Sequence, residues 1–446
     1  MIDAMRKHLW LGALALVSIL AVVFTPVLAA SSPSDLEARV AALEAEVQEL
    51  KAQLAEQRAA SAAGPSAPAP PITSGPASIS ASGETAAGPG GTEARSPLSW
   101  FGYGELNYSR PSDDPSQATF DLARFVLGAG YRFDERTRLQ SEVEIEHAVS
   151  SASDPGEVEV EQAYIERELS GDLRTQLGLF LIPSGLINEN HEPTRYYGVF
   201  RNFVETAIIP TTWREGGVGL QGNTSNGLRW NAGVTTGFDL SKWDPASAAG
   251  AKSPLGSIHQ ELALARAADL AGFLAANYTG LNGLRIGASI YSGGAAQDQP
   301  GFHDNRVTLW EGHARWQSAV WDLAALYAHG HISTTAPINL NFISTISEPT
   351  LVPEDFFGWY LEAAWRGRLG RSWPLVPFLR YERFNTGSSY ATLASGVTPP
   401  ARRDQTALTG GLQVEIAPGV VLKTDYVDFT DGSSGDRFDL GLGYEF

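Results

Sequence analysis

The chain has 446 residues, a net charge of -18 and no cysteine, which excludes disulfides and argues against nucleic-acid binding, because that needs a basic surface. Its mean hydropathy of -0.12 argues against a bundle of membrane-spanning helices but not against a β-barrel, whose strands average an apolar and a polar face. Eleven Trp residues suit either the aromatic girdles of a membrane barrel or a soluble sugar-binding β protein.

Residues 1–29 have the features of a secretory signal peptide. Arg6 and Lys7 precede an apolar stretch from Leu9 to Val23, and Val27-Leu28-Ala29 offers a cleavage site. An uncleaved anchor helix is the alternative, but the apolar run is short for a membrane span. The pattern therefore predicts export from the cytoplasm.

Residues 34–58 have the pattern of a coiled-coil helix. Ser34 and Glu37 form a capping box at its start. The apolar seam alternates spacings of four and three residues and consists of Leu36, Val40, Leu43, Val47, Leu50 and Leu54. A helix this short is marginal alone, so we expect it to clamp a homotrimer in the periplasm. A single solvated helix or a periplasmic spacer is the alternative.

Residues 59–98 are dominated by Ala, Ser, Gly and Pro. Such a composition cannot build a packed core, because it offers few large apolar side chains. We expect a disordered linker between the helix and the rest of the chain.

The stretch from Arg437 to Phe446 shows the pattern that recurs from Trp100 onward. Apolar residues occupy one parity, and polar residues and glycine occupy the other, so a strand here has one apolar and one polar face. Short turns such as Phe133 to Arg136 alternate with longer polar loops. The predicted fold class is all-β: a transmembrane antiparallel β-barrel of about 16 strands over residues 99–446, preceded by the N-terminal coiled-coil helix. The stretch from Ser257 to Tyr278 also has helical spacing, and we expect a loop with some helix that enters a strand near Asp269.

Parity assigns charged side chains to the barrel interior, which we expect to be wet because unpaired charges in a dry core cost several kcal/mol each. The predicted pore-lining residues are Arg124, Arg132, Arg138, Glu142, Glu144, Glu146, Glu159, Glu161, Arg174 and Arg229. The turn after Tyr131 places Arg124 beside Glu146, and the next strand is expected to bring Glu159 and Glu161 beside Glu146 and Glu144. Like charges across a sheet destabilise it. Our hypothesis is that a loop arginine, Arg195 or Arg201, compensates this patch; a water-screened wall that attracts cations is the alternative.

The stretch from Pro183 to Glu215 is too long for an ordinary connection and indicates a functional segment. A loop of this length can fold into the lumen and narrow it, and charged rings at a constriction select solutes. The predicted constriction-loop residues are His191, Glu192, Arg195, Tyr196, Tyr197, Arg201 and Arg214. Three further residues, Glu205, Trp213 and Glu215, are better explained as fixing the loop to the wall.

Several motifs resemble those of the phosphate-selective porin O and P family and related trimeric outer-membrane porins. They include FGYGELNY at Phe101 to Tyr108, ARFVLGAGYRF at Ala123 to Phe133, NENHEPTRYYGV at Asn188 to Val199, IIPTTWREGGVGLQG at Ile208 to Gly222 and the final LGLGYEF. The resemblance implies a sixteen-stranded trimeric porin with a constriction loop. Its phosphate-specific members are similar in using an arginine ladder and a lysine cluster, whereas beyond the N-terminal helix this chain has only Lys242, Lys252 and Lys423.

No motif indicates catalysis: the chain lacks a Gly-rich phosphate loop with lysine, a GxSxG elbow and an HExxH helix. We therefore expect no enzyme activity and no cofactor. We also expect no metal site, because the strand period turns His147 away from the face that carries Glu142, Glu144 and Glu146.

The predicted function is an outer-membrane porin of a Gram-negative bacterium, for passive diffusion of small hydrophilic or charged solutes, with anions such as phosphate among the candidates. The expected partners are outer-membrane lipid, two further copies of the chain, small solutes or ions, and the barrel-assembly machinery, which would read the C-terminal strand ending in Phe446. The alternatives are an outer-membrane barrel enzyme, and a trimeric envelope tether or adhesin in which the coiled coil acts.

Overall fold

The computed structural model describes residues 96–149, 151, 155–369, 373–431 and 435–446. The predicted signal peptide (1–29), the coiled-coil helix (34–58) and nearly all of the linker (59–98) lie outside the described residues, so these domain assignments stay predictions. In the part of the chain that is described, no helix combines the length and apolar character needed to cross a membrane.

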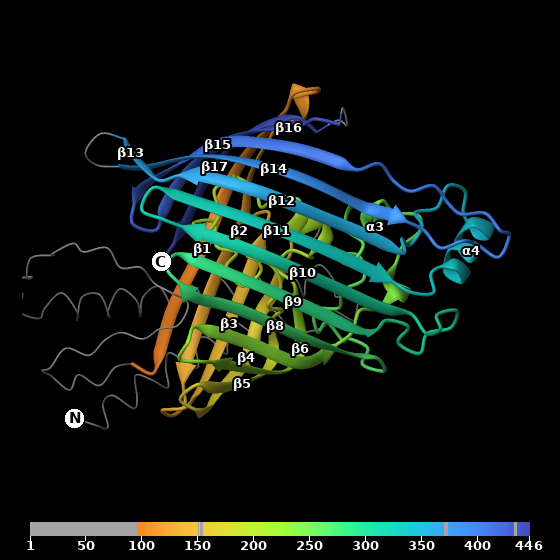
Figure 1. The fold of residues 1–446 in the computed structure, drawn as a ribbon, viewed down its shortest axis with the longest axis horizontal. Helices are drawn as coiled ribbons and strands as arrows, with labels where there is room; N and C mark the ends of the chain where they lie inside the picture. Colours follow the sequence, from red (N-terminus) through yellow and green to blue (C-terminus); the bar gives the residue numbers. More distant parts are fainter. Residues whose placement is uncertain (1–95, 150, 152–154, 370–372, 432–434) are drawn as a thin grey trace, which may run out of the picture. The chain divides into compact units, whose positions relative to one another are not determined.

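The described residues form a closed antiparallel barrel, as the alternation predicted (Figure 1). Each strand pairs with its neighbours in the chain, and β1 pairs with β17 to close the sheet. The short β13 pairs with the same strand, β14, as β12 does, so β12 and β13 share one position and the barrel has sixteen strand positions. The strands are β1 (Leu98–Pro111), β2 (Thr119–Arg132), β3 (Thr137–Glu146), β4 (Val158–Ser170), β5 (Leu173–Leu181), β6 (Arg214–Asn223), β7 (Leu228–Thr236), β8 (Leu270–Leu281), β9 (Leu284–Gly294), β10 (Arg306–Gln317), β11 (Trp321–Ile332), β12 (Asp355–Trp365), β13 (Gly367–Leu369), β14 (Trp373–Ser389), β15 (Gln405–Ala417), β16 (Val420–Phe429) and β17 (Arg437–Glu445).

The two faces of the strands follow parity. In β17, Phe438 and Leu440 are 39% and 43% exposed, whereas Asp439 between them is fully buried. In β2, Leu127 and Tyr131 point outward and the exception that the pattern contained, Val126, is buried inside. The outer face therefore presents the apolar band that hydrocarbon requires, and polar side chains point inward.

Short turns gather at one end of the barrel and long loops at the other. The predicted turn at Phe133 to Arg136 joins β2 to β3, and β8 begins at Leu270, close to the predicted Asp269. The long loops carry the π-helix η2 (Val204–Ile208), the 3-10 helices η1 (Pro115–Gln117) and η3 (Leu240–Lys242), and the α-helices α3 (Ala249–Lys252) and α4 (Ala336–Thr345). Both α-helices lie at the end of the barrel opposite the C terminus (Figure 1).

The helix expected after Ser257 is wrong: residues 257–269 contain turns and bends but no helix. Glu261, Leu262 and Leu264 have positive φ angles, which lie outside the helical region of backbone space. The two short helices of this loop, η3 and α3, both precede the predicted position.

The interior is charged as expected in part, but it also contains a large apolar region. Inward-facing apolar side chains meet apolar residues of the long loops in one buried group, the apolar cluster. Its larger members include Phe180, Ile182, Leu186, Val204, Ile208, Ile209, Trp213, Phe238, Leu240, Trp243, Leu255, Ile258, Tyr291, Leu309, Leu326, Phe356, Tyr360 and Phe384. Burial of this apolar surface stabilises the packing of the loops inside the barrel, because about 25 cal/mol is gained per Å² of apolar surface removed from water.

Candidate functional site: the constriction loop

The connection between β5 and β6, residues 182–213, folds into the lumen and is called the constriction loop here. Its middle part meets strands on the far side of the barrel, because Val199 N donates to Asp425 of β16 at 2.6 Å. Tyr197 Oη donates to Asp322 of β11, also at 2.6 Å, and η2 contacts β11, β12 and β14. The loop therefore crosses the lumen, as its length predicted.

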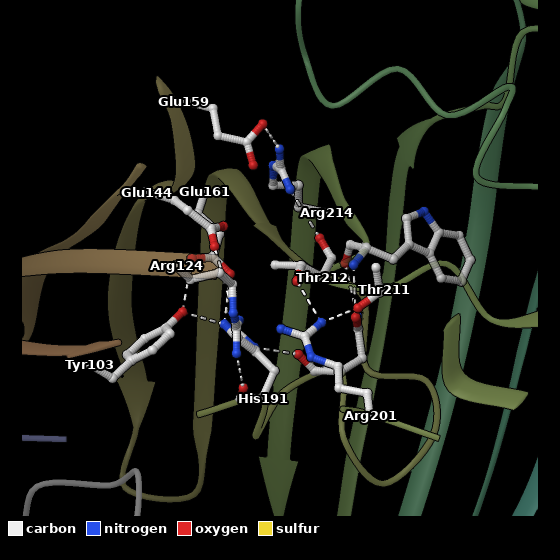
Figure 2. A network of polar contacts seen from close by, with 12 residues as sticks. Tyr103, Arg124, Glu144, Glu159, Glu161, His191, Arg201, Thr211, Thr212 and Arg214 are labelled. Carbon is white, nitrogen blue, oxygen red and sulfur yellow. Dashed lines mark hydrogen bonds and ion pairs between the residues drawn. The ribbon is translucent and has the colours of Figure 1, made fainter. Parts of the chain in front are cut away.

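His191 attaches the first part of the loop to the wall formed by β1, β2 and β4. Its Nε2 lies 2.6 Å from Oε1 of Glu161 and 2.5 Å from Oη of Tyr103. Arg124 donates to the His191 carbonyl at 2.9 Å and to Glu105 at 2.7 Å. Figure 2 shows Tyr103, Arg124, Glu161 and His191 converging from these elements.

The charge of His191 follows from these neighbours. Burial by itself would lower the pKa of its imidazole, but the carboxylate of Glu161 outweighs burial and the pKa is raised above its ordinary value. The carboxylate of Glu161 therefore favours the protonated form of the ring.

The glutamates predicted to line the pore do face inward, but the loop covers most of them. Glu142, Glu144 and Glu161 are 6%, 1% and 0% exposed, and Arg124 is 6% exposed. Glu161 and Arg124 hold the loop through His191, and Glu142 and Glu144 are buried beside them. Glu146, at the end of β3, is partly exposed.

The predicted register is correct for one strand pair and wrong for the next. Arg124 lies opposite Glu146, as expected. On the other side of β3, Glu159 lies opposite Glu144 rather than Glu146, and a bulge between Glu142 and Val143 shifts the pairing by one residue. A bulge adds one unpaired residue, and alternation alone does not reveal it. Glu161 falls at this irregularity and its side chain reaches His191.

The hypothesis that Arg195 or Arg201 compensates the acidic patch is not what the structure shows. Arg195 lies 3.3 Å from Glu445 and 3.8 Å from Glu192. Arg201 donates to the hydroxyls of Thr211 and Thr212, and so ties two parts of the loop together. The cations that meet these glutamates are Arg124 at Glu144, His191 at Glu161 and Arg214 at Glu159.

Lys423 of β16 is a functional residue that sequence reasoning missed. Its Nζ donates to the carbonyls of Tyr196 and Gly198 at 2.8 and 2.9 Å and lies 3.8 Å from the centre of the Tyr196 ring. The only signal in the sequence is a lone lysine at an inward position.

The two predicted tyrosines of the loop also make hydrogen bonds. Tyr196 donates to Glu105 at 2.8 Å, and burial raises the pKa of Tyr197 to about 12. Both predicted tyrosines are thus neutral hydrogen-bond donors that fix the loop.

Glu205 fixes the second half of the loop, which confirms its predicted role. Its carboxylate accepts hydrogen bonds from the backbone amides of Leu186 and Ile187 and from Oη of Tyr360, each at 2.8 Å. The side-chain amide of Asn202 adds a fourth donor at 3.1 Å. Burial raises the pKa of Glu205 even so.

We expect Glu205→Ala to lower the free energy of unfolding by about 2–4 kcal/mol, because several buried donors lose their acceptor. Urea titration of the refolded barrel measures the change. Glu192→Ala in the same loop is the control, since its side chain is 26% exposed, and we expect less than about 1 kcal/mol there. An equal effect of the two substitutions would contradict the role of Glu205.

The end of the loop belongs to the apolar cluster and to a rim of charges. Trp213 is fully buried, with its ring 5.4 Å from Phe238 and 4.6 Å from Tyr291. The predicted loop residue Arg214 is the first residue of β6, and its guanidinium lies near Glu159 at 2.5 Å and Glu261 at 3.1 Å. Arg214 therefore joins the barrel rim to the loop between β7 and β8 and lies away from the His191 group (Figure 2).

A row of arginines lies on the inner face of alternate strands, at the end with short turns. Arg138 of β3, Arg174 of β5 and Arg229 of β7 are 43%, 31% and 49% exposed at the side chain. Arg285 of β9, which the sequence analysis did not single out, is also exposed. We call these four residues the arginine wall. Their exposure inside the barrel shows that water reaches this part of the lumen.

One group of side chains has the composition of a metal site. Glu142, Glu161 and His191 each offer a ligand atom, and these atoms lie within 4.8 Å of one another. The predicted absence of a metal site considered His147, which lies elsewhere and contacts Asp121 at 2.6 Å. The sequence did not reveal this group because its histidine comes from a loop remote from both strands.

Solved structures with this fold are outer-membrane proteins. The structure is similar to OmpF of Salmonella typhi in complex with daunomycin, with 13% identity and a TM-score of 0.55 over 78% of this chain and 97% of that chain. The loop L8 deletion mutant of Vibrio cholerae OmpT has 12% identity and a TM-score of 0.48, over 78% and 99% of the two chains. The anion-selective porin from Comamonas acidovorans has 11% identity and a TM-score of 0.47, over 78% and 99%. At these identities the likeness is one of fold.

Sequence comparison identifies a nearer relative. No protein-family model matches the chain. An uncharacterized protein of Aquifex aeolicus (strain VF5) is 32% identical over 354 residues, which cover 77% of this chain and 79% of that protein. The matched region is therefore much longer than any single motif of the barrel. The chain therefore belongs to the same family as this Aquifex aeolicus protein.

Proposed function

We propose that the protein is an outer-membrane porin through which small hydrophilic solutes diffuse, with a preference for anions. The closed barrel and its apolar outer face support a place in the outer membrane. The observation that carries the proposal is the arginine wall: charged side chains that point into the barrel and are nevertheless solvated.

The arginine wall is electrically unbalanced on the solvated side. Arg138 pairs with Glu166 at 2.8 Å, and Arg174 lies 3.9 Å from the same carboxylate. Arg229 lies 3.5 Å from Glu189 of the constriction loop. Four guanidinium groups thus share three nearby carboxylates, which are Glu166, Glu189 and Glu168, the residue opposite Arg174. Clefts lined by one sign of charge concentrate counter-ions, so this wall attracts anions.

The opposing negative charge is largely removed from the solute path. Glu142, Glu144 and Glu161 are covered by the constriction loop and are engaged with Arg124 and His191. The chain's net charge of -18 therefore does not describe the lumen. The preference for anions depends on which charged side chains remain in contact with water, and not on how many charged residues the chain contains.

Phosphate is one candidate solute, since guanidinium groups bind phosphate well. The resemblance to phosphate-selective porins includes a lysine cluster, and this chain departs from it: Lys423 is buried and holds loop carbonyls. We therefore propose a general anion preference, with phosphate among the solutes to be tested.

A homotrimer fits this function, with the N-terminal coiled coil as its periplasmic clamp. The chain ends on the aromatic Phe446, and β17 pairs with β1 to close the barrel. The same strand offers the signal that the barrel-assembly machinery would read. A native mass measurement of the purified protein tests these parts of the proposal, which are the assembly, the coiled coil and the signal peptide.

We expect the triple substitution Arg138→Gln, Arg174→Gln, Arg229→Gln to lower the anion-to-cation permeability ratio by at least about tenfold, because it removes most of the wall's charge. Reversal potentials of single channels in a salt gradient measure this ratio. Phosphate and neutral sugars, added as blockers, compare solute classes.

Arg383→Gln is the matched control for the triple variant. Arg383 is similarly exposed, but it lies on the outer face of β14 beside Asp404, so selectivity should not change. Cation selectivity of the wild-type channel would overturn the anion preference. The absence of any conductance would overturn the porin itself.

A further inference from the structure

The group formed by Glu142 of β3, Glu161 of β4 and His191 of the constriction loop is distinct from the arginine wall. Its three ligand atoms lie within 4.8 Å of one another, and the residues are 6%, 0% and 3% exposed. Two carboxylates and one imidazole at this spacing are a ligand set that divalent metals use. The group is enclosed by protein on the side where the loop meets the wall.

The hydrogen bonds of His191 leave one ring nitrogen directed at the carboxylates. Nδ1 lies 3.0 Å from the carbonyl of Asn188, an acceptor that requires a proton on Nδ1. Nε2 is the atom near Glu161 and Tyr103. Histidines that bind metals commonly donate their other nitrogen to a backbone carbonyl in this way.

The charges around the group are not balanced by protein alone. The nearest arginine, Arg124, is committed to Glu105 at 2.7 Å and lies 3.8 Å from Glu144. Tyr103 donates to Glu161 and Gln162 forms a hydrogen bond with Glu142, but these donors are neutral, so within the group two carboxylates face one imidazole. Oε1 of Glu161 is fully buried and accepts no hydrogen bond of good geometry, although Nε2 of His191 lies 2.6 Å away. Buried carboxylate oxygens without donors are costly, and a cation between the two glutamates would remove this cost.

We propose that Glu142, Glu161 and His191 bind one divalent transition-metal ion, of the class of Zn²⁺ or Mn²⁺, which joins the constriction loop to the barrel wall. Imidazole together with carboxylates favours such ions, whereas Ca²⁺ and Mg²⁺ prefer sites made of oxygen alone. The Tyr103 hydroxyl, which donates to Oε2 of Glu161 at 2.9 Å, positions that carboxylate.

The distances within the group must change when a metal enters. Ligand atoms lie about 2.0–2.2 Å from zinc, so Nε2 and Oε1 would move apart until each reaches the ion. The loop carries His191 and can supply this movement, while Glu142 and Glu161 stay on the strands.

The experiment uses the full-length mature protein, purified in detergent, stripped with a chelator and titrated with Zn²⁺ by calorimetry. We expect one Zn²⁺ to bind per chain. His191→Gln and Glu142→Gln should each weaken binding at least about tenfold. The same titration with Ca²⁺ should give at most weak binding.

His313→Gln is the matched control. His313 and Glu311 form another buried histidine–carboxylate pair, at 2.8 Å, outside the three-residue group, so its loss should leave zinc binding unchanged. Wild-type protein loaded with Mn²⁺ provides a second test that needs no variant. Electron spin-echo spectroscopy should show a nitrogen nucleus coupled to the manganese.

Zinc binding that is unchanged in His191→Gln and Glu142→Gln would overturn the site, as would the absence of a coupled nitrogen on Mn²⁺ or of any binding to the wild type. None of these measurements depends on conductance. The metal site can therefore fail while the porin stands, and the reverse also holds.

Discussion

Replacement of residues 184–211 of the constriction loop by a short Gly-Ser linker is expected to raise single-channel conductance several-fold. The loop spans the lumen from the β1–β4 wall, through His191, to β11, through the 2.6 Å hydrogen bond from Tyr197 to Asp322. Under the proposed function this loop, rather than the strands, would set the cross-section available to ions, and conductance follows bore. Planar-bilayer recordings of the purified variant measure the change.

Two controls separate this effect from general disruption. The exposed connection between β14 and β15, at residues 391–399, can be shortened in the same way, and its conductance should remain that of the wild type. A mobility shift on heating in detergent shows whether each barrel has folded. Conductance that stays at the wild-type level in a folded loop-deletion variant would mean that the loop does not limit the channel.

We expect Trp213→Ala to lower the free energy of unfolding by about 3–5 kcal/mol, the range for removing a large aromatic side chain from a packed core. Trp213 is fully buried and stands between Phe238 of the next long loop and Tyr291 of β9. Its removal leaves a cavity where two loops and the wall meet. Urea titration followed by circular dichroism measures the loss.

Trp213→Phe retains a ring at this position, so the expected loss is smaller, below about 2 kcal/mol. Trp310→Ala is the control on the outer face, where the side chain is 44% exposed and lies beside Tyr327, outside the apolar cluster. If Trp213→Ala cost no more than Trp310→Ala, the cluster would not be the element that holds the loops in the barrel.

The outer face of the barrel was predictable because it depends on local geometry. Side chains alternate along a strand regardless of what lies beyond it, so Leu127, Tyr131, Phe438 and Leu440 had to share the outer face once the segments were strands. The same rule placed Glu142 and Glu144 inside. Turn residues between alternating segments placed most strand ends to within a few positions.

The contacts of the constriction loop were not predictable, because they join residues far apart in the chain. Lys423 and Tyr196 are 227 positions apart, and Tyr197 and Asp322 are 125 apart. Alternation also predicts that an inward charge is solvated, and Glu161 and Lys423 show that a loop can cover it. The bulge beside Glu142 shifted one register, and a single extra residue leaves no clear periodic signal.

By itself, the sequence determined that residues 99–446 form a β-barrel with an apolar outer face, because the period of two is a property of each strand alone. Only the tertiary structure decided which inward charges remain in water. That outcome depends on where the loop between β5 and β6 lies, and its position is set by the sum of many long-range contacts. The loop covers the glutamates with His191 and leaves the arginine wall solvated, and this division gives the lumen its proposed selectivity.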